Sequence, residues 1–437
     1  MKRIGDESGR TEGVSAILAE LNNQEELHEI LKTLIRFRTP NPPGGNEKEA
    51  QAWVADRLKK LGFEVDVFDV LPDRPNVVGM LRGTGEGKLV ILNGHIDVCE
   101  DCLNERWSRD PYDPYVEAGA LIGKGSSDMK GALAAFLFVL EWVRRKGHKF
   151  KGDVIFESVI GEERGEPGTR RSLEKGYRAD FAIVGEPAKG AKELYAAVGI
   201  TNGRITLESP YTLHLQERRY FIHAGGGREG ANCIEKMALI IIPALNDLER
   251  YWGVFKKHPL MPPGQSMLNV FNFIGGGNTF LIPDKCVVDF TAYYLPGEEK
   301  ESVQKEVEDK ISRVSQGDEW LRKYPPIVEW DPEPDAYQFL PFELNINEPG
   351  VQTLMKSYRK ATGNNLSIGG RGAIVDSGWF SSAGIPVVTF GPGDAFWAHR
   401  IDERVELAAL STYCQTLAIF LCEWCGLASS LWVKAAR

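Results

Sequence analysis

Residues 89–99 read LVILNGHIDVC and place an apolar run ahead of two polar side chains, His95 and Asp97. The apolar run is typical of a buried strand. Side chains at positions i and i+2 of a strand point to the same face, so the imidazole and the carboxylate would lie side by side at its end. A buried carboxylate is costly unless a cation or hydrogen bonds compensate for its desolvation. The pair therefore indicates a partner of this kind nearby.

Helix and strand patterns alternate on both sides of this stretch. Helical periodicity marks residues 24–36, 46–62 and 129–147, and apolar strand candidates follow at 152–160 and 179–187. Apolar strands separated by helices predict an α/β core with a central, mainly parallel sheet. Ligand sites in such sheets lie beyond the carboxyl ends of the strands.

The pattern changes near residue 198. Residues 199–327 form a block of strands and charged helix that indicates a smaller α+β domain inserted in the core. The α/β pattern then resumes. We therefore expect a discontinuous core domain of residues 1–198 and 328–437.

The composition is that of an ordinary globular protein, with 43% hydrophobic residues, 26% charged residues and a formal net charge of −9. Because the net charge is negative, neither nucleic acid nor an anionic membrane is expected as a partner. No stretch approaches the roughly 20 apolar residues that cross a bilayer, and the first residues lack the apolar run of a secretory signal. With an odd count of seven cysteines, these features predict a cytoplasmic protein with free thiols.

Two CxxC spacings, Cys99–Cys102 and Cys422–Cys425, raise the possibility of a four-cysteine zinc site. Such a site would require both pairs to meet in space. The second pair lies in an apolar run that is typical of a packed helix, which disfavours this interpretation.

Potential metal ligands follow one strand candidate after another. They are His95 and Asp97, Asp128, Glu162 and Glu163, Glu186, and His399. Each has an ordinary explanation when taken alone, such as a helix N-cap for Asp128 or a solvated turn for the glutamate pair. Together, several carboxylates at one sheet edge would be costly without a cation. Two imidazoles with carboxylates form a nitrogen and oxygen ligand set suited to zinc, manganese or cobalt.

Seven segments carry a resemblance to a known family. In chain order they read GHIDV, GKGSSDMKGALAAF, GEERGEPGT, VGEP, HAGGGREGANCIEKM, LNVFNFIGGG with IPDKC, and FGPGDAFWAHRIDE. This ordered set resembles the metal-dependent aminoacylase and carboxypeptidase G-like metallopeptidases, which include acetylornithine deacetylase and succinyl-diaminopimelate desuccinylase. The resemblance implies a zinc-peptidase-like catalytic domain, an inserted lid and dimerisation domain, and a homodimer.

The resemblance also implies how the metal ligands are shared between two sites. Asp128 would bridge two divalent ions. His95 and Glu186 would complete one site, and Glu163 and His399 would complete the other.

Three further residues receive roles from the same resemblance. Asp97 would accept the second ring N–H of His95 and fix its tautomer. Glu162 would be the general base that takes a proton from the activated water and passes it to the leaving amine. His223, in the inserted domain, would reach into the partner's active site and stabilise an oxyanion. The alternative for His223 is a loop histidine before flexible glycines.

Departures from the family pattern concern the substrate. Asn269 resembles a substrate-side position. Tyr293 stands where many relatives carry an arginine, and tyrosine cannot supply a bidentate cationic fork for a carboxylate. Arg371 is either a replacement for that carboxylate binder or a surface arginine. Aromatic residues at Tyr293 and near His223 raise the possibility of an aromatic substrate, although core packing explains most of them equally well.

Three functions remain open from these observations. The leading prediction is a hydrolase that uses one or two zinc, manganese or cobalt ions to cleave the amide carbon–nitrogen bond of an N-acyl amino acid, a small peptide or a related amide. The alternative is a metal-dependent aminohydrolase that displaces an amino group from an aromatic ring. A catalytically silent, metal-stabilised binding protein is less favoured, because a binding module needs the ligands but not the base Glu162.

Overall fold

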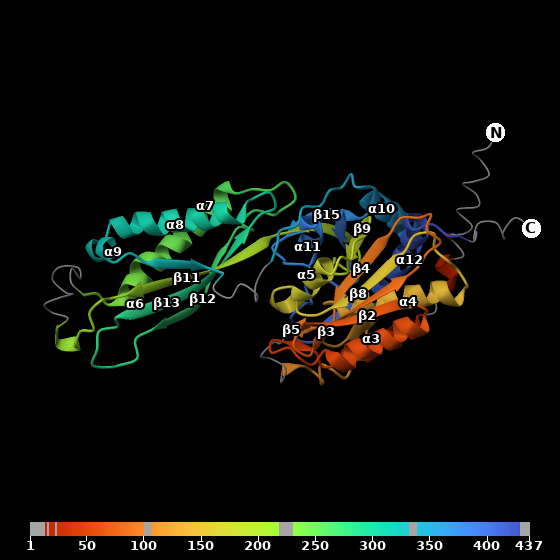
Figure 1. The fold of residues 1–437 in the computed structure, drawn as a ribbon, viewed down its shortest axis with the longest axis horizontal. Coiled ribbons are helices and arrows are strands. Elements are labelled where there is room, and N and C mark those ends of the chain that lie inside the picture. Colours follow the sequence, from red (N-terminus) through yellow and green to blue (C-terminus); the bar gives the residue numbers. More distant parts are fainter. Residues whose placement is uncertain are drawn as a thin grey trace, which may run out of the picture. The chain divides into compact units, whose positions relative to one another are not determined.

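The computed structural model describes residues 14, 17–21, 24–99, 106–217, 230–331 and 339–428. The chain divides into two compact units (Figure 1). Unit 1 comprises Met1–Tyr195, Leu344–Gly369 and Val375–Arg437, and unit 2 comprises Ala196–Glu343 and Gly370–Ile374.

The second unit boundary differs from the one predicted at residues 327 and 328. Strand β14 (Ile327–Trp330) pairs antiparallel with β11 (Gly199–Glu208), so it belongs to the sheet of unit 2. Unit 2 consequently continues to Glu343. The prediction was wrong here because a four-residue edge strand carries little sequence pattern, and its hydrogen bonds to a strand over a hundred positions earlier decide its place.

A six-stranded sheet forms the centre of unit 1, in the order β16-β9-β4-β8-β3-β2. Its strands are β2 Glu64–Leu71, β3 Arg74–Leu81, β4 Val90–His95, β8 Val154–Val159, β9 Phe181–Val184 and β16 Val387–Thr389. The four strands from β16 to β8 run parallel, and β3 and β2 add antiparallel at one edge. Every residue of β4, β8 and β9 is buried, as expected of strands covered on both faces. The predicted α/β core is confirmed.

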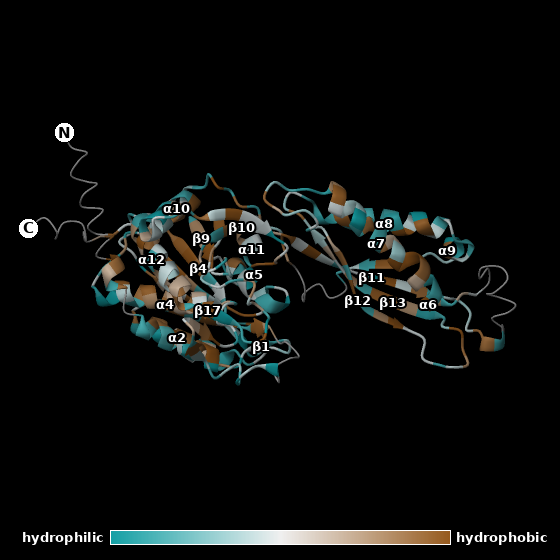
Figure 2. Cartoon of the chain, turned by 180° about the vertical axis from the view of Figure 1, so that it is seen from behind, coloured by the Kyte–Doolittle hydropathy of each residue, from teal (hydrophilic) through white to brown (hydrophobic). Residues whose placement is uncertain are grey.

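Helices with buried faces pack around this sheet. They are α2 Glu25–Arg36, α3 Lys48–Lys60, α4 Lys130–Arg145, α5 Pro167–Glu174, α10 Pro349–Thr362, α11 Ser377–Ser382 and α12 Leu407–Trp424. Helix α4 contacts β4 as well as α2 and α12, and it is buried from Lys130 to Val143. Figure 2 shows the same trend, with β4 and β9 coloured mainly as hydrophobic.

Two small sheets border the carboxyl ends of the parallel strands. Strand β5 (Val98–Cys99) follows β4 and pairs with β1 (Pro40–Asn41). Strand β7 (Ala120–Ile122) pairs with β6 (Tyr115–Glu117) on one side and with β17 (Arg404–Glu406) on the other. These pairings hold the segments that contain His95, Asp128 and His399.

Unit 2 contains a four-stranded antiparallel sheet in the order β12-β13-β11-β14, with β12 at Leu268–Gly275 and β13 at Lys285–Tyr294. Its helices are α6 Cys233–Lys236, a π-helical segment Met237–Ile241, α7 Ile242–Phe255, α8 Lys300–Gln316 and α9 Glu319–Lys323. Trp252, Phe290 and Trp320 are fully buried in one hydrophobic core. Unit 2 is therefore an α+β unit with a core of its own.

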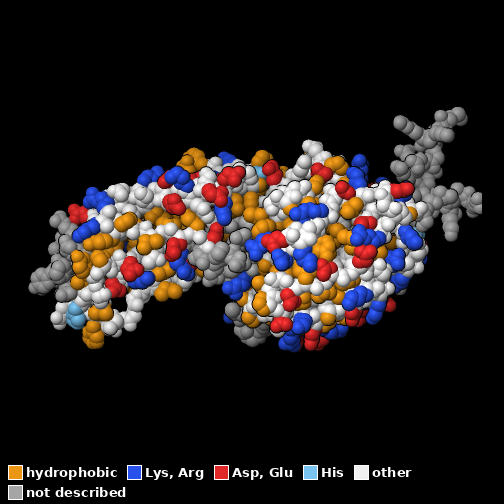
Figure 3. All heavy atoms as spheres, in the orientation of Figure 1, with side chains coloured by type: hydrophobic (Ala, Val, Ile, Leu, Met, Phe, Trp, Pro, Cys, Tyr) orange, Lys and Arg blue, Asp and Glu red, His pale blue; other side chains and the backbone are white. Residues whose placement is uncertain are grey.

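On the surface, Lys and Arg side chains are interspersed with Asp and Glu over the face shown in Figure 3. Among the described helices, none is long and apolar enough to span a membrane.

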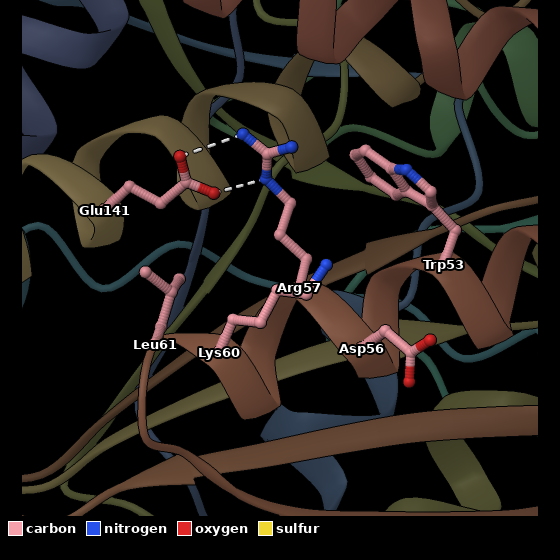
Figure 4. Close-up of a pocket in the computed structure, with 6 residues that line it drawn as sticks. All are labelled: Trp53, Asp56, Arg57, Lys60, Leu61 and Glu141. Atoms are coloured by element: carbon pink, nitrogen blue, oxygen red, sulfur yellow. Dashed lines mark hydrogen bonds and ion pairs between the residues drawn. The ribbon is translucent and has the colours of Figure 1, made fainter.

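A pocket of about 330 Å³ lies where α3 meets α4, away from the predicted ligands (Figure 4). Arg57 crosses it and donates from Nη2 to Glu141 Oε2 at 2.9 Å, while its guanidinium lies 5.1 Å from the Trp53 ring centroid. None of the predicted metal ligands lines this pocket. The ion pair of Arg57 and Glu141 therefore ties α3 to α4.

Candidate metal centre

His95 ends β4 and is fully buried among carboxylates. Its Nε2 lies 3.2 Å from Asp128 Oδ1 and 3.3 Å from Glu186 Oε1. Asp128 comes just before α4, and Glu186 follows β9 by two residues, so the parallel sheet brings all three to its carboxyl edge. The ligand atoms of the three residues lie within 4.8 Å of one another. An imidazole and two carboxylates at this spacing can hold one divalent cation.

His399 and Glu163 form a second group around the same aspartate. His399 Nε2 lies 3.0 Å from Glu163 Oε2 and 3.3 Å from Asp128 Oδ2. The two oxygens of Asp128 therefore face different histidines, Oδ1 toward His95 and Oδ2 toward His399. A carboxylate that bridges two cations needs this arrangement.

Glu162 lies beside the first group rather than within it. Its Oε2 is 3.8 Å from His95 Nε2, and its side chain is buried. Burial, together with the negative charge of Glu186, raises the pKa of Glu162 well above its ordinary value. A raised pKa suits a carboxyl group that must take up a proton and hold it during a reaction.

The protonation of the cluster reflects its crowded charges. Burial and the neighbouring Asp128 carboxylate raise the pKa of Glu186 to about 8. Burial alone would also raise the pKa of Asp128, but hydrogen bonds from His399 and His95 outweigh it and lower that pKa. The carboxylates and imidazoles thus share protons, and a divalent cation would replace those protons when it binds.

Asp97 contacts His95 through a different atom from the one predicted. His95 Nδ1 lies 2.9 Å from the backbone carbonyl oxygen of Asp97, whereas the carboxylate Oδ1 is 3.7 Å away. Strand β4 ends at His95, so the two side chains do not share a strand face as expected. The carboxylate instead accepts from the backbone N–H groups of Gly161, at 2.9 Å, and Glu163, at 3.3 Å. A carbonyl oxygen only accepts, so Nδ1 donates and Nε2 faces the ligand carboxylates.

Comparison with known proteins identifies the family. Residues 91–423 match Peptidase family M20/M25/M40. The chain belongs to this family. N-formyl-4-amino-5-aminomethyl-2-methylpyrimidine deformylase of Bacillus subtilis is 40% identical over 410 residues, which cover 92% of this chain and 96% of that protein. Succinyl-diaminopimelate desuccinylase of Leptothrix cholodnii is 29% identical over 402 residues, which cover 87% and 94%.

A solved structure shows the same fold for this M20 family member. A tripeptidase from Staphylococcus aureus aligns with a TM-score of 0.71 at 19% identity, covering 91% of this chain and 98% of that one. The resemblance drawn from the sequence motifs is thereby confirmed. The protein is a metal-dependent hydrolase of amide carbon–nitrogen bonds, and it binds divalent metal ions.

Sequence reasoning missed Glu403, which holds the loop that carries Asp128 in this M20 protein. The buried Glu403 carboxylate accepts three backbone N–H groups, from Gly125 at 2.8 Å, Ser127 at 2.8 Å and Asp128 at 2.9 Å. Its position at the end of the His399 segment was the available signal.

The predicted substrate residues lie in unit 2. Asn269 is exposed on β12, Tyr293 is partly buried on β13, and Arg371 ends β15 (Ser367–Arg371), which pairs with β10 (Glu193–Ala197). Their roles toward the substrate stay predictions. His223 lies outside the described residues.

Proposed function

We propose that this protein removes a formyl group from an N-formyl aminomethyl pyrimidine or a closely related aromatic formamide. The support is the alignment of nearly the whole chain with the Bacillus subtilis deformylase, together with a cluster that can hold two cations about one bridging carboxylate. A formamide attached to an aromatic ring system would also account for two features of the sequence, namely the hydrolase motifs and the tyrosine at position 293.

The observation that carries the chemistry is the position of Asp128 between His95 and His399. We propose that Asp128, His95 and Glu186 hold one cation and that Asp128, Glu163 and His399 hold the other. The mixed nitrogen and oxygen donors favour zinc, manganese or cobalt. When bound, such cations supply a Lewis acid for the amide carbonyl and lower the pKa of water.

We assign Glu162 as the general base. Its carboxylate takes a proton from the attacking water and returns it to the leaving nitrogen as the carbon–nitrogen bond breaks, so that water and the formamide yield formate and the free amine. Glu162 is buried within 3.8 Å of His95 Nε2, close enough to serve the first site. The Asp97 carboxylate fixes the loop that carries it.

The test combines metal reconstitution with a substrate screen. Chelated protein would be reloaded with zinc, manganese or cobalt and offered N-formyl aminomethylpyrimidine, N-formyl benzylamine, N-acetyl and N-succinyl amino acids, and dipeptides. We expect equal amounts of formate and amine from the formamides, and only after metal is restored. Full activity without metal would contradict the proposal, and so would a clear preference for the succinyl or peptide substrates. Release of ammonia from the ring amino group would favour an aminohydrolase.

The variant Glu162→Gln tests the proposed base without changing any of the proposed metal ligands. We expect this variant to keep its metal and lose at least about a hundredfold in turnover, the scale typical of general base catalysis. Glu117→Gln makes the same chemical change at an exposed position of unit 1 and should retain full activity. Turnover at the parent rate in Glu162→Gln would show that another group is the base.

We also propose a homodimer formed through unit 2. Strand β12 is an edge strand, and Phe271 and Ile274 on it are 60% and 61% exposed. Helix α7, which packs against β12, exposes Val254 and Phe255. An edge strand with exposed apolar side chains is a ready site for pairing with another chain.

Sedimentation of two matched variants tests this assembly. Ile274→Lys on β12 should give monomers, whereas Ile327→Lys on the opposite edge strand β14, also exposed, should leave the dimer intact. If His223 acts in the partner's site, mixing His223→Ala chains with Glu162→Gln chains should restore part of the activity. Dimers that persist in Ile274→Lys would show that a different surface is used.

For the substrate side, we propose Tyr293 as a stacking surface for an aromatic ring, with Asn269 and Arg371 as polar contacts. Tyr293→Ala should raise KM for the aromatic formamide more than for an aliphatic one, while kcat changes little. We further propose a cytoplasmic location, which the free thiols of the described cysteines support.

A further inference from the structure

Cys99 lies at the His399 side of the metal centre, and the proposed mechanism uses no thiol. It ends β5, where it pairs with Asn41 of β1. Its Sγ and ligand atoms of Glu163 and His399 all lie within 4.8 Å of one another. The other described cysteines are buried, three of them on or next to α12. The fold therefore places Cys99 among the candidate ligands. Its CxxC spacing in the sequence does not explain this position.

We propose that Cys99 is a thiolate ligand of the cation at the Glu163–His399 site. This inference rests on the proposed metal centre. Metal–ligand bonds of about 2.0–2.3 Å place the donor atoms of one ion within roughly 4.5 Å of each other, close to the spread of these three atoms. Sulfur, imidazole nitrogen and a carboxylate oxygen are all ordinary ligands of zinc.

A thiolate makes the two cation sites unequal. At the second site, Cys99 would add a sulfur donor to Glu163 and His399, with Asp128 Oδ2 beside His399. At the first site, His95, Glu186 and Asp128 Oδ1 would supply nitrogen and oxygen donors alone. Glu162 lies beside this first site. Cys99 would thus give one cation a sulfur donor that the other cation lacks.

The thiolate also sets a preference among metals. Thiolates favour zinc and cobalt, whereas carboxylate and water ligands suit manganese and magnesium. The second site is therefore expected to select zinc or cobalt over manganese, and the first site to discriminate less.

Cobalt absorption spectroscopy tests this assignment without any assay of activity. Chelated full-length protein, Cys99→Ser and Cys102→Ser would be titrated with Co²⁺. We expect an intense sulfur-to-cobalt charge-transfer band in the parent and in Cys102→Ser, the matched change at the neighbouring thiol. Cys99→Ser should lose the band and bind the second ion at least about tenfold more weakly, the scale on which altered surroundings change metal affinity.

A second measurement needs no variant. Zinc should protect Cys99 from alkylation by iodoacetamide, as read by peptide mass mapping, while chelation should expose it. Two bound cobalt ions without a charge-transfer band, or a band that survives in Cys99→Ser, would overturn the thiolate ligand but leave the proposed metal centre standing. A parent protein that binds no cobalt would overturn both.

Discussion

The carboxylate of Asp97 accepts a hydrogen bond from the backbone N–H of Gly161, at 2.9 Å from Oδ1. Gly161 has a φ of 83°, a left-handed conformation that glycine adopts without strain. It opens the short turn that carries Glu162 and Glu163, and Oδ2 of Asp97 accepts from the Glu163 N–H at 3.3 Å. Asp97 therefore joins the end of β4 to the turn that supplies the proposed base.

Asp97→Asn tests this connection. An amide has one accepting oxygen, so its NH₂ group would face a backbone donor and leave it unpaired. We expect a loss of about 1.5–3 kcal/mol in the free energy of unfolding and a lower metal content. Urea unfolding and metal analysis measure the two effects. Asp110→Asn, at the exposed Asp110 paired with Arg38, is the control, and equal behaviour of the two variants would contradict the role of Asp97.

Glu403→Gln should act on metal affinity. The glutamine amide can no longer accept all three N–H groups of the loop before α4, so Asp128 loses its fixed position. We expect divalent affinity to fall by about 10–100-fold, measured by calorimetric titration. Glu406→Gln changes an exposed residue on β17, the strand that follows Glu403, and should bind metal as the parent does. Unchanged metal affinity in Glu403→Gln would show that the loop before α4 keeps its position without the Glu403 carboxylate.

Removal of metal should destabilise the protein. Three carboxylates lie close together at the candidate centre, those of Asp128, Glu163 and Glu186. A cation that binds only the folded protein stabilises it by mass action, by about 2.7 kcal/mol when the free cation concentration is a hundred times Kd. Thermal unfolding should therefore shift upward when zinc or cobalt is added to chelated protein. His95→Ala should show a smaller shift. An equal shift in both proteins would place the stabilising cation elsewhere.

The burial of Glu157 predicts that the stability of the protein depends on pH. It is fully buried in β8, with Oε2 3.0 Å from Asn93 Nδ2, and burial raises its pKa from 4.5 to about 7. Between these values the folded state keeps a proton that the unfolded state has lost, so stability falls as pH rises through this window. Each pKa unit corresponds to 1.36 kcal/mol, which gives a loss of up to about 3 kcal/mol by pH 7.

Glu157→Gln should remove this loss, because the amide stays neutral at every pH in the window. Its free energy of unfolding relative to the parent should rise from pH 4.5 to pH 7 and then stay level. Glu64→Gln, at an exposed position on β2, should show no such trend. Parallel pH profiles for Glu157→Gln and the parent would mean that Glu157 is ionised in the folded protein.

Much of the fold was open to prediction because its signals are local. The buried strands β4, β8 and β9 are continuous apolar runs, and α4 carries a long apolar segment, so their type follows from periodicity alone. Most of the candidate ligands could be named for the same reason, since they follow such a strand, while Asp128 comes just before α4. Strand β14 could not be placed, because four residues with little pattern join unit 2 only through pairing with β11.

By itself, the sequence determined which side chains stand at the strand ends, and parallel strands place their carboxyl ends at one edge of a sheet. Only the tertiary structure decided which atoms meet there. It turned the Asp97 carboxylate away from His95 and toward Gly161, brought Glu403 under the loop of Asp128, and set Cys99 beside His399. Some of these contacts join segments far apart along the chain, and others depend on the residue at which a strand ends. Local periodicity predicts neither long-range contacts nor strand ends.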